Sequence, residues 1–129
     1  MVYEKSLVVS TDDLDELKHV NNVRYVQWIQ DISKDHWAAV APAIYKENYI
    51  WVVLTHTIQY KQAACIKEEI IIKTHITKSS GVRCTRVVAF YRKRDNTLLV
   101  SASTVWCFLD ATTHKPTRIP DILNSLFLT

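Results

Sequence analysis

The sequence contains a single glycine, Gly81, among its 129 residues. Phosphate-binding loops such as the P-loop and the dinucleotide fingerprint need several glycines within a short span, because the backbone must approach the phosphates closely. The shortage of glycine therefore excludes nucleotide hydrolysis through a P-loop and Rossmann-type dinucleotide chemistry.

Long apolar runs, paired cysteine motifs and a strong excess of charge are also missing. No segment approaches the ~20 apolar residues that a membrane helix needs, and the acidic start differs from a secretory signal, so we expect a cytoplasmic protein without a membrane partner. A formal net charge of +3 is too small to predict nucleic-acid binding. The histidines lack the spacing of metal ligands, so we predict no metal and no cofactor. The three cysteines are predicted to be reduced residues of the core or sheet: Cys65, Cys84 and Cys107.

The composition is that of one folded domain spanning residues 1–129. Hydrophobic residues make up 48% of the chain and charged residues 22%, which gives enough apolar surface to offset the entropy of ordering the chain. No repeat and no linker divides the sequence, so a second domain is unsupported.

Helical spacing is confined to the first part of the chain. Residues 2–10 are rich in β-branched residues and predict a strand, and residues 11–18 form an acidic turn. An amphipathic helix is predicted over residues 22–37, with Asn21 or Asn22 as its cap and a short helical piece at residues 43–48 to follow. The apolar stripe of the long helix contains Val26, Ile29 and Trp37, which share one side with Asn22 and Ser33. Tyr25, Trp28 and Ile32 widen this stripe.

The rest of the chain predicts long strands. They cover residues 49–60, 69–78, 82–94 and 98–110, and short turns at residues 79–81 and 95–96 make the last three antiparallel neighbours. We therefore expect an α+β fold in which a long antiparallel sheet wraps around one central helix. Apolar residues on both faces of the last strand exceed what one helix can cover, which favours an oligomer.

The densest group of reactive side chains, residues 11–25, lies where the first strand leads into the helix. A helix start offers unpaired amides and the positive end of its dipole, which can stabilise negative charge developing on a carbonyl oxygen. Beside it, Asp15 could act as general base or as nucleophile, and both routes hydrolyse an activated acyl group. Alternatively, these acids, His19 and the two asparagines serve only as turn and capping groups.

The segment DLDELKHVNNVRYVQWIQD resembles the signature of the hotdog-fold acyl thioesterases, the branch of 4-hydroxybenzoyl-CoA thioesterase-like enzymes and plant acyl-carrier-protein thioesterases. The resemblance extends over nearly the whole chain, including IQYKQAA and DATTHKPTRIP. It implies a hotdog fold and hydrolysis of an acyl-CoA or acyl-carrier-protein thioester by a homodimer or homotetramer.

The resemblance also implies roles for single residues. Asp15 matches the family base or nucleophile, Asn22 the residue that orients the thioester, and His19 a catalytic or supporting histidine. Amides near Asn22 and Val23 would form the oxyanion site, and the substrate-binding set is Val23, Tyr25 and Trp28. Lys18 replaces a common glycine and Leu17 replaces an asparagine of the plant enzymes, so we favour a simpler mechanism centred on Asp15.

The acyl tail is expected between subunits, in a channel lined by Trp28, Trp37, Tyr49 and Trp51. Basic residues that could receive the phosphates of coenzyme A are Lys61, Lys78, Arg83 and residues 92–94. Two alternatives stay open: a hotdog hydratase or dehydratase that uses His19 and Asp15, and a non-catalytic acyl-CoA-binding protein on the same fold.

Overall fold

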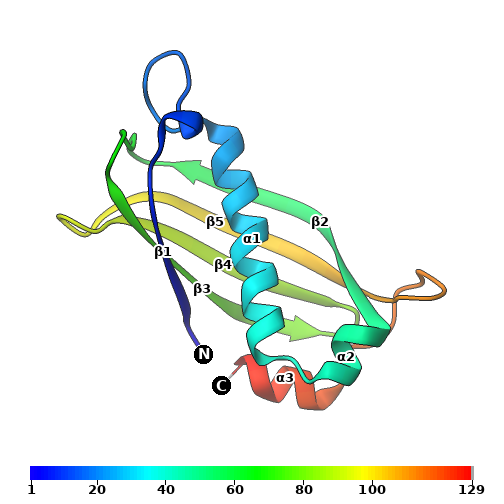
Figure 1. Cartoon of the computed structure of the whole chain (residues 1–129). Helices are drawn as coiled ribbons and strands as arrows, with labels where there is room; N and C mark the ends of the chain where they lie inside the picture. Colours follow the sequence, from blue (N-terminus) through cyan, green and yellow to red (C-terminus); the bar gives the residue numbers. More distant parts are fainter. Residues whose placement is uncertain (129) are drawn as a thin grey trace.

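A five-stranded antiparallel sheet curves around one long helix in the computed structural model, which describes residues 1–128 (Figure 1). The elements in chain order are β1 (Tyr3–Val8), η1 (Thr11–Asp13), α1 (Asn22–Val40), α2 (Ala43–Asn48), β2 (Tyr49–Tyr60), β3 (Glu69–Ser80), β4 (Arg83–Arg92), β5 (Thr97–Asp110) and α3 (Asp121–Leu128). The strand order is β1-β3-β4-β5-β2. The predicted α+β arrangement of a long sheet around a central helix is confirmed.

Two tight hairpins connect β3 to β4 and β4 to β5. Their turns cover residues 81–82 and 93–96, within two residues of the predicted turns at 79–81 and 95–96. Gly81 and Asn96 take left-handed backbone conformations in these turns, with φ of 62° and 56°. Glycine adopts such a conformation without steric cost, and asparagine tolerates it better than most residues. The single glycine of the chain therefore lies where its freedom is needed.

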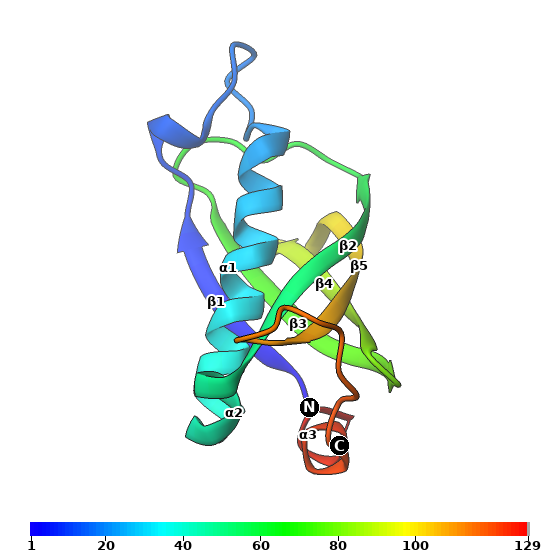
Figure 2. The same ribbon diagram turned by 90° about the vertical axis from the view of Figure 1, so that its right-hand side faces the viewer.

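Helix α1 lies against the concave face of the sheet, with β1 and β2 on its two sides (Figure 2). Its buried residues recur at helical spacing: Tyr25, Ile29, Ile32, Ser33 and His36. The predicted stripe placed Val26 and Trp37 on this face, but both are only half-buried. The spacing of apolar residues gives the helical period, but which side of the helix is buried depends on where the sheet packs against it. The helix also continues three residues beyond Trp37 and ends before Pro42, whose ring disfavours helical backbone in the preceding residue.

The buried side chains form two clusters, one for each half of α1. The first core packs Tyr25 and Ile29 against Phe90 of β4, and the second core joins Trp106 and Phe108 of β5 to residues near the C-terminus. The full membership of the first core is Val9, Val20, Tyr25, Ile29, Ile32, Ala64, Ile70, Ile72, Val88, Phe90, Leu99, Val100 and Ala102. That of the second core is Ala41, Ile76, Cys84, Trp106, Phe108, Ile119, Leu123 and Phe127.

Three features differ from the sequence-based expectations. Helix α3 was not predicted, because its apolar residues span only two turns, yet it packs against β3. The first strand ends at Val8, since Ser10 donates its amide to Asp13 and opens η1. Cys65 is exposed in the loop after β2, whereas Cys84 and Cys107 are buried sheet residues as expected, and all three are free thiols. Within the described residues, no helix is both long and apolar enough to cross a membrane.

Candidate active site

The carboxylate of Asp15 lies in a tight loop of residues 14–20 that immediately precedes α1. An isolated antiparallel bridge closes the base of this loop, and the Asp15 amide donates to the His19 carbonyl at 2.8 Å. Inside the loop, Oδ1 of Asp15 accepts the backbone amides of Leu17 at 2.9 Å and His19 at 3.1 Å. These bonds orient the carboxylate, and Oδ2 has no hydrogen-bond partner within residues 1–128.

The loop is tied to the first turn of α1. Arg24 forms an ion pair with Asp13, with 3.2 Å between Nε and Oδ1. The Asn21 amide donates to the Asp13 carbonyl at 2.8 Å, and the Val20 amide donates to the Ala64 carbonyl at 2.9 Å. Because both sides of the loop are anchored, Asp15 keeps a defined position relative to the helix start.

Asn21 is the cap of α1. Its side-chain oxygen accepts the Val23 amide at 2.9 Å, and its carbonyl accepts the Arg24 amide at 2.9 Å. The Val23 amide, one of the two predicted oxyanion donors, is therefore already engaged. Asn22 is the exposed first residue of the helix, and an amide at this position has no intrahelical acceptor. The Asn22 amide is the donor that the helix start leaves available.

Tyr25 and Trp28, predicted to bind substrate, face the first core. Tyr25 is 2% exposed, and its ring meets those of Trp28 and Phe90 edge-on, with centroid distances of 5.4 and 5.1 Å. Burial raises the pKa of Tyr25 to about 12, and its hydroxyl has no hydrogen-bond partner in the described part of the chain. Packing is thus the evident role of Tyr25, and a contact of either residue with substrate stays a prediction.

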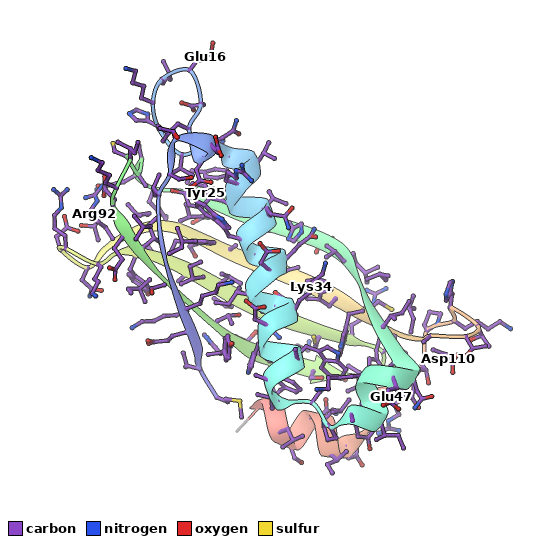
Figure 3. The ribbon with its side chains drawn as sticks, in the orientation of Figure 1. Glu16, Tyr25, Lys34, Glu47, Arg92 and Asp110 are labelled. Carbon is purple, nitrogen blue, oxygen red and sulfur yellow. The ribbon has the colours of Figure 1, made fainter. Side chains whose placement is uncertain are left out.

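The predicted catalytic residues, by contrast, are grouped at the start of α1. Asp15 and His19 come from the loop and Asn22 from the first helical position, and His19 is exposed. Figure 3 shows Glu16 at the tip of the loop, pointing away from the body of the molecule, and Tyr25 below the loop. The arrangement offers a carboxylate, an imidazole and a helix start to a group that docks from solvent.

A cavity of about 310 Å³ lies at the other end of α1, between the second half of that helix, strands β2 to β5 and α3. Five of its lining residues are aromatic: Trp37, Tyr49, Trp51, Trp106 and Phe127. Three of the four predicted channel residues are therefore found here, whereas Trp28 packs in the first core. Because α1 has 19 residues and rises ~1.5 Å per residue, the cavity lies far from Asp15 of the same chain.

The cavity wall contains polar groups that the sequence analysis missed. Arg86 is 5% exposed, and its Nη1 donates to Thr74 Oγ1 at 3.1 Å and lies 2.9 Å from His36 Nδ1. Burial lowers the pKa of His36 to about 4, with a contribution from the Arg86 charge, so His36 is neutral and Nδ1 is the acceptor. Burial also lowers the pKa of Arg86, to about 10, which leaves it charged at neutral pH. A signal existed, since Arg86 follows the same alternation as the buried residues of β4.

The basic residues predicted to receive phosphates differ in their surroundings. Arg92 forms ion pairs with Glu68 and Asp95, and Lys93 pairs with Glu69 at 2.8 Å. These pairs neutralise much of the β4–β5 turn. The exposed members of the predicted set without an ion pair in residues 1–128 are Lys61, Lys78, Arg83 and Arg94. A role for any of the predicted basic residues in binding coenzyme A stays a prediction.

A long antiparallel sheet around one helix, with an acidic loop at the helix start, defines a hotdog-fold protein. The family model of the thioesterase-like superfamily matches residues 9–127, so the chain belongs to this superfamily. The predicted class of enzyme, a thioester hydrolase, is confirmed at the level of the family.

Solved structures share the fold at low sequence identity. The 1,4-dihydroxy-2-naphthoyl-CoA thioesterase of Synechocystis has a TM-score of 0.82 and 14% identity, over 98% of this chain and 95% of that one. A DHNA-CoA thioesterase of Staphylococcus aureus has a TM-score of 0.83 and 18% identity, over 96% and 87%. Another S. aureus protein, solved in complex with CoA, has a TM-score of 0.86 and 13% identity, over 98% and 81%. Among curated proteins, no sequence match is found.

Proposed function

We propose that this protein hydrolyses acyl thioesters of coenzyme A, or of an acyl carrier protein, through Asp15 and the start of α1. The observation that carries the proposal is the Asp15 carboxylate, which has one oxygen held by two amides and the other unengaged. Coenzyme A is the favoured carrier, because structural relatives include CoA thioesterases and a protein solved with CoA bound.

Two routes lead from this geometry to the same products. As a nucleophile, Asp15 Oδ2 attacks the thioester carbon, the C–S bond breaks, the thiolate leaves, and water hydrolyses the resulting anhydride to regenerate the carboxylate. As a general base, Oδ2 takes a proton from water while the oxygen of that water attacks the same carbon; the C–S bond then breaks, and the departing thiolate receives the proton back from Asp15. In both routes the Asn22 amide and the helix dipole stabilise the oxyanion, and exposed His19 supports the bound thioester.

We also propose that the working unit is a dimer joined through β2. This strand is a sheet edge of 12 residues, and its exposed apolar residues are Ile50, Val52 and Leu54. The opposite edge, β1, has six residues and exposes the charged Glu4 and Lys5. A long apolar edge readily pairs with another strand, whereas a short charged edge does not, so a second copy is the fitting partner for β2.

Antiparallel pairing of two β2 strands would also complete the site. Tyr60, at the end of β2, lies beside Tyr25 in the first turn of α1, with 5.9 Å between ring centroids. Trp51, near the start of β2, lines the cavity. Pairing around a two-fold axis brings the end of one strand next to the start of its partner. The Asp15 loop of one subunit would then face the cavity of the other, as expected for an acyl tail between subunits.

The dimer is tested by a charge on the exposed side of β2. Val52→Lys should shift the protein from dimer to monomer in sedimentation and lower hydrolysis in parallel. Glu4→Lys on the β1 edge is the matched control and should leave the dimer intact. A wild-type protein that sediments as a monomer at every concentration would refute this part of the proposal.

Hydrolysis is tested by following thiol release from short, medium, long and aromatic acyl-CoA thioesters. Asp15→Asn should lower kcat at least ~100-fold, the usual range for a general base, without unfolding the loop, because the asparagine oxygen still accepts both amides. Glu16→Gln at the loop tip is the matched control and should retain activity. No release above the uncatalysed rate would overturn the proposal. Binding without turnover would instead indicate an acyl-CoA-binding protein, and hydration of an enoyl-CoA without thiol release would indicate a hydratase.

A further inference from the structure

The cavity at the second half of α1 contains a buried positive charge, the Arg86 guanidinium, that forms no ion pair with an acidic side chain of residues 1–128. The hydrogen bonds of Arg86 within the described residues both come from Nη1, to the neutral partners Thr74 and His36. No ion pair joins Arg86 to an acid in residues 1–128. A buried, unpaired guanidinium is costly, and folded proteins retain such groups where a partner completes them.

The indole N–H of Trp106 is a second hydrogen-bond donor in the same wall without an acceptor in residues 1–128. Trp106 is 7% exposed and lines the cavity, and its buried indole N–H has no acceptor within residues 1–128. Trp106 pairs with Cys84 across β4 and β5, and Arg86 pairs with Thr104. Trp106 and Arg86 are thus diagonal neighbours on the inward face of two adjacent strands, a relation that places Cβ atoms ~7–8 Å apart. Both side chains are long and line the same cavity, so their donors can serve one group that has two acceptor atoms.

The remaining wall limits the rest of the ligand. It is mainly aromatic and aliphatic, with Trp37, Trp51 and Phe127 among its members. Lys34 and Lys46, both exposed, add positive charge at the cavity (Figure 3 labels Lys34 on α1). The volume of about 310 Å³ holds about ten non-hydrogen atoms, since a water molecule occupies ~30 Å³. A carboxylate matches the one buried cation in charge and offers two acceptor atoms, and the apolar wall suits a ligand whose remainder is uncharged.

We propose that this cavity binds an apolar carboxylic acid of about ten non-hydrogen atoms in all, its carboxylate held by Arg86 and the Trp106 indole N–H. The same chemistry has two sources: a free carboxylic acid, or the acidic far end of a dicarboxylic acyl chain still joined to its thiol. The binding itself does not depend on the proposed hydrolysis.

Direct binding measurements on the full chain test the site. Sub-micellar decanoic acid, methyl decanoate and decanol are titrated calorimetrically, with tryptophan fluorescence as a second signal because three of the four tryptophans line the cavity. The acid should bind at least tenfold more tightly than the ester or the alcohol, since only the acid supplies charged acceptors. Equal affinities for the acid and the ester would overturn the proposal.

Variants identify the donors. Arg86→Met removes the charge and should abolish the preference for the acid, and Trp106→Phe removes the N–H while keeping a ring and should weaken acid binding at least threefold without affecting the ester. Tyr91→Phe, at a half-buried position of β4 outside the cavity wall, is the control and should bind as the wild type. If Arg86→Met fails to fold, two other variants still test the site: Trp106→Phe, and Leu123→Trp, whose larger side chain fills the cavity and should block acid binding. Unchanged acid binding in both Trp106→Phe and Leu123→Trp would refute the site.

Two further arms separate the sources of the carboxylate and separate this site from the hydrolytic one. Asp15→Asn should bind decanoic acid as the wild type, so loss of hydrolysis and loss of acid binding are distinguishable. Sebacoyl-CoA, a ten-carbon monothioester with a free far carboxylate, is compared with decanoyl-CoA. If Arg86→Met loses binding of sebacoyl-CoA but keeps binding of decanoyl-CoA, the carboxylate that the site recognises is the far end of an acyl chain. If Arg86→Met changes the binding of both thioesters equally but loses the binding of decanoic acid, the ligand of the site is a free acid.

Discussion

The two halves of α1 place their polar groups in opposite ways. At the first half, Tyr25 and Phe90 close a fully packed core, and the reactive Asp15 lies outside it on a loop. At the second half, the core surrounds a cavity of about 310 Å³, and the charged Arg86 lies inside. One helix thus supports an exposed loop site at its start and, near its end, a partly open cavity whose wall contains a buried charge.

Truncation of a large side chain should cost more in the closed half. Phe90→Ala removes a ring that is 0% exposed and packed by Tyr25 and Trp28, and should lower the free energy of unfolding by about 3–5 kcal/mol. Phe127→Ala should cost roughly half as much, because that ring already borders empty space. Urea unfolding of both variants measures the difference, and equal costs would show that the second core is packed as densely as the first.

Enlarging a side chain should also cost more in the first core than at the cavity. Val88→Phe in the first core adds volume at a 0% exposed position and should cost about 1–3 kcal/mol through forced rearrangement. Ile76→Phe, at the cavity wall, can place its ring in the open space and should cost less than about 1 kcal/mol. Comparable losses from the two substitutions in urea unfolding would argue that the cavity collapses in solution.

Acid should weaken the second half through His36. The pKa of its imidazole is about 4 in the folded protein and near 6.5 when exposed, so the unfolded chain binds more protons between these values and stability falls as the pH falls. From pH 8 to pH 5 this amounts to about 2 kcal/mol. The groups facing the ring are Tyr3, Phe127, Arg86 and the N-terminal residue Met1.

A variant isolates this contribution from that of the carboxylates. His36→Gln carries no titratable ring, so its stability should change by about 2 kcal/mol less than that of the wild type over the same pH range. His19→Gln, on the exposed loop, should retain the wild-type pH dependence. Parallel stability curves for wild type and His36→Gln would contradict the neutral, buried state of His36.

The difference between the halves also explains what the sequence could predict. Asp15, His19 and Asn22 lie within eight consecutive residues, so their grouping depends only on a local turn and a helix start. The long strands and α1 were equally accessible, because each depends on a period that neighbouring residues reveal. The roles of these three residues are not yet tested, and the position of the loop is what the structure adds.

The cavity could not be predicted in this way, because its wall comes from segments far apart in the chain. Arg86 and Trp106 become neighbours only through the pairing of β4 with β5, and α3 returns from the C-terminus to cover the same region. The available signal was Arg86, which occupies a strand position whose side chain points to the same face as the buried apolar residues of β4. That position indicated burial of Arg86 but did not indicate its partner. Volume left between side chains has no signature in a single sequence.

The smallest predicted effect concerns the donor at the helix start. Asn21→Ala removes the acceptor of the Val23 amide and should lower the free energy of unfolding by about 1 kcal/mol, whereas Asn21→Asp retains an acceptor and should match the wild type. Because Asn22 carries the amide without an intrahelical acceptor, kcat for thiol release should stay unchanged in Asn21→Ala. A rise in kcat would mean that Asn21 occupies a donor the reaction needs, and the oxyanion would then belong to the Val23 amide.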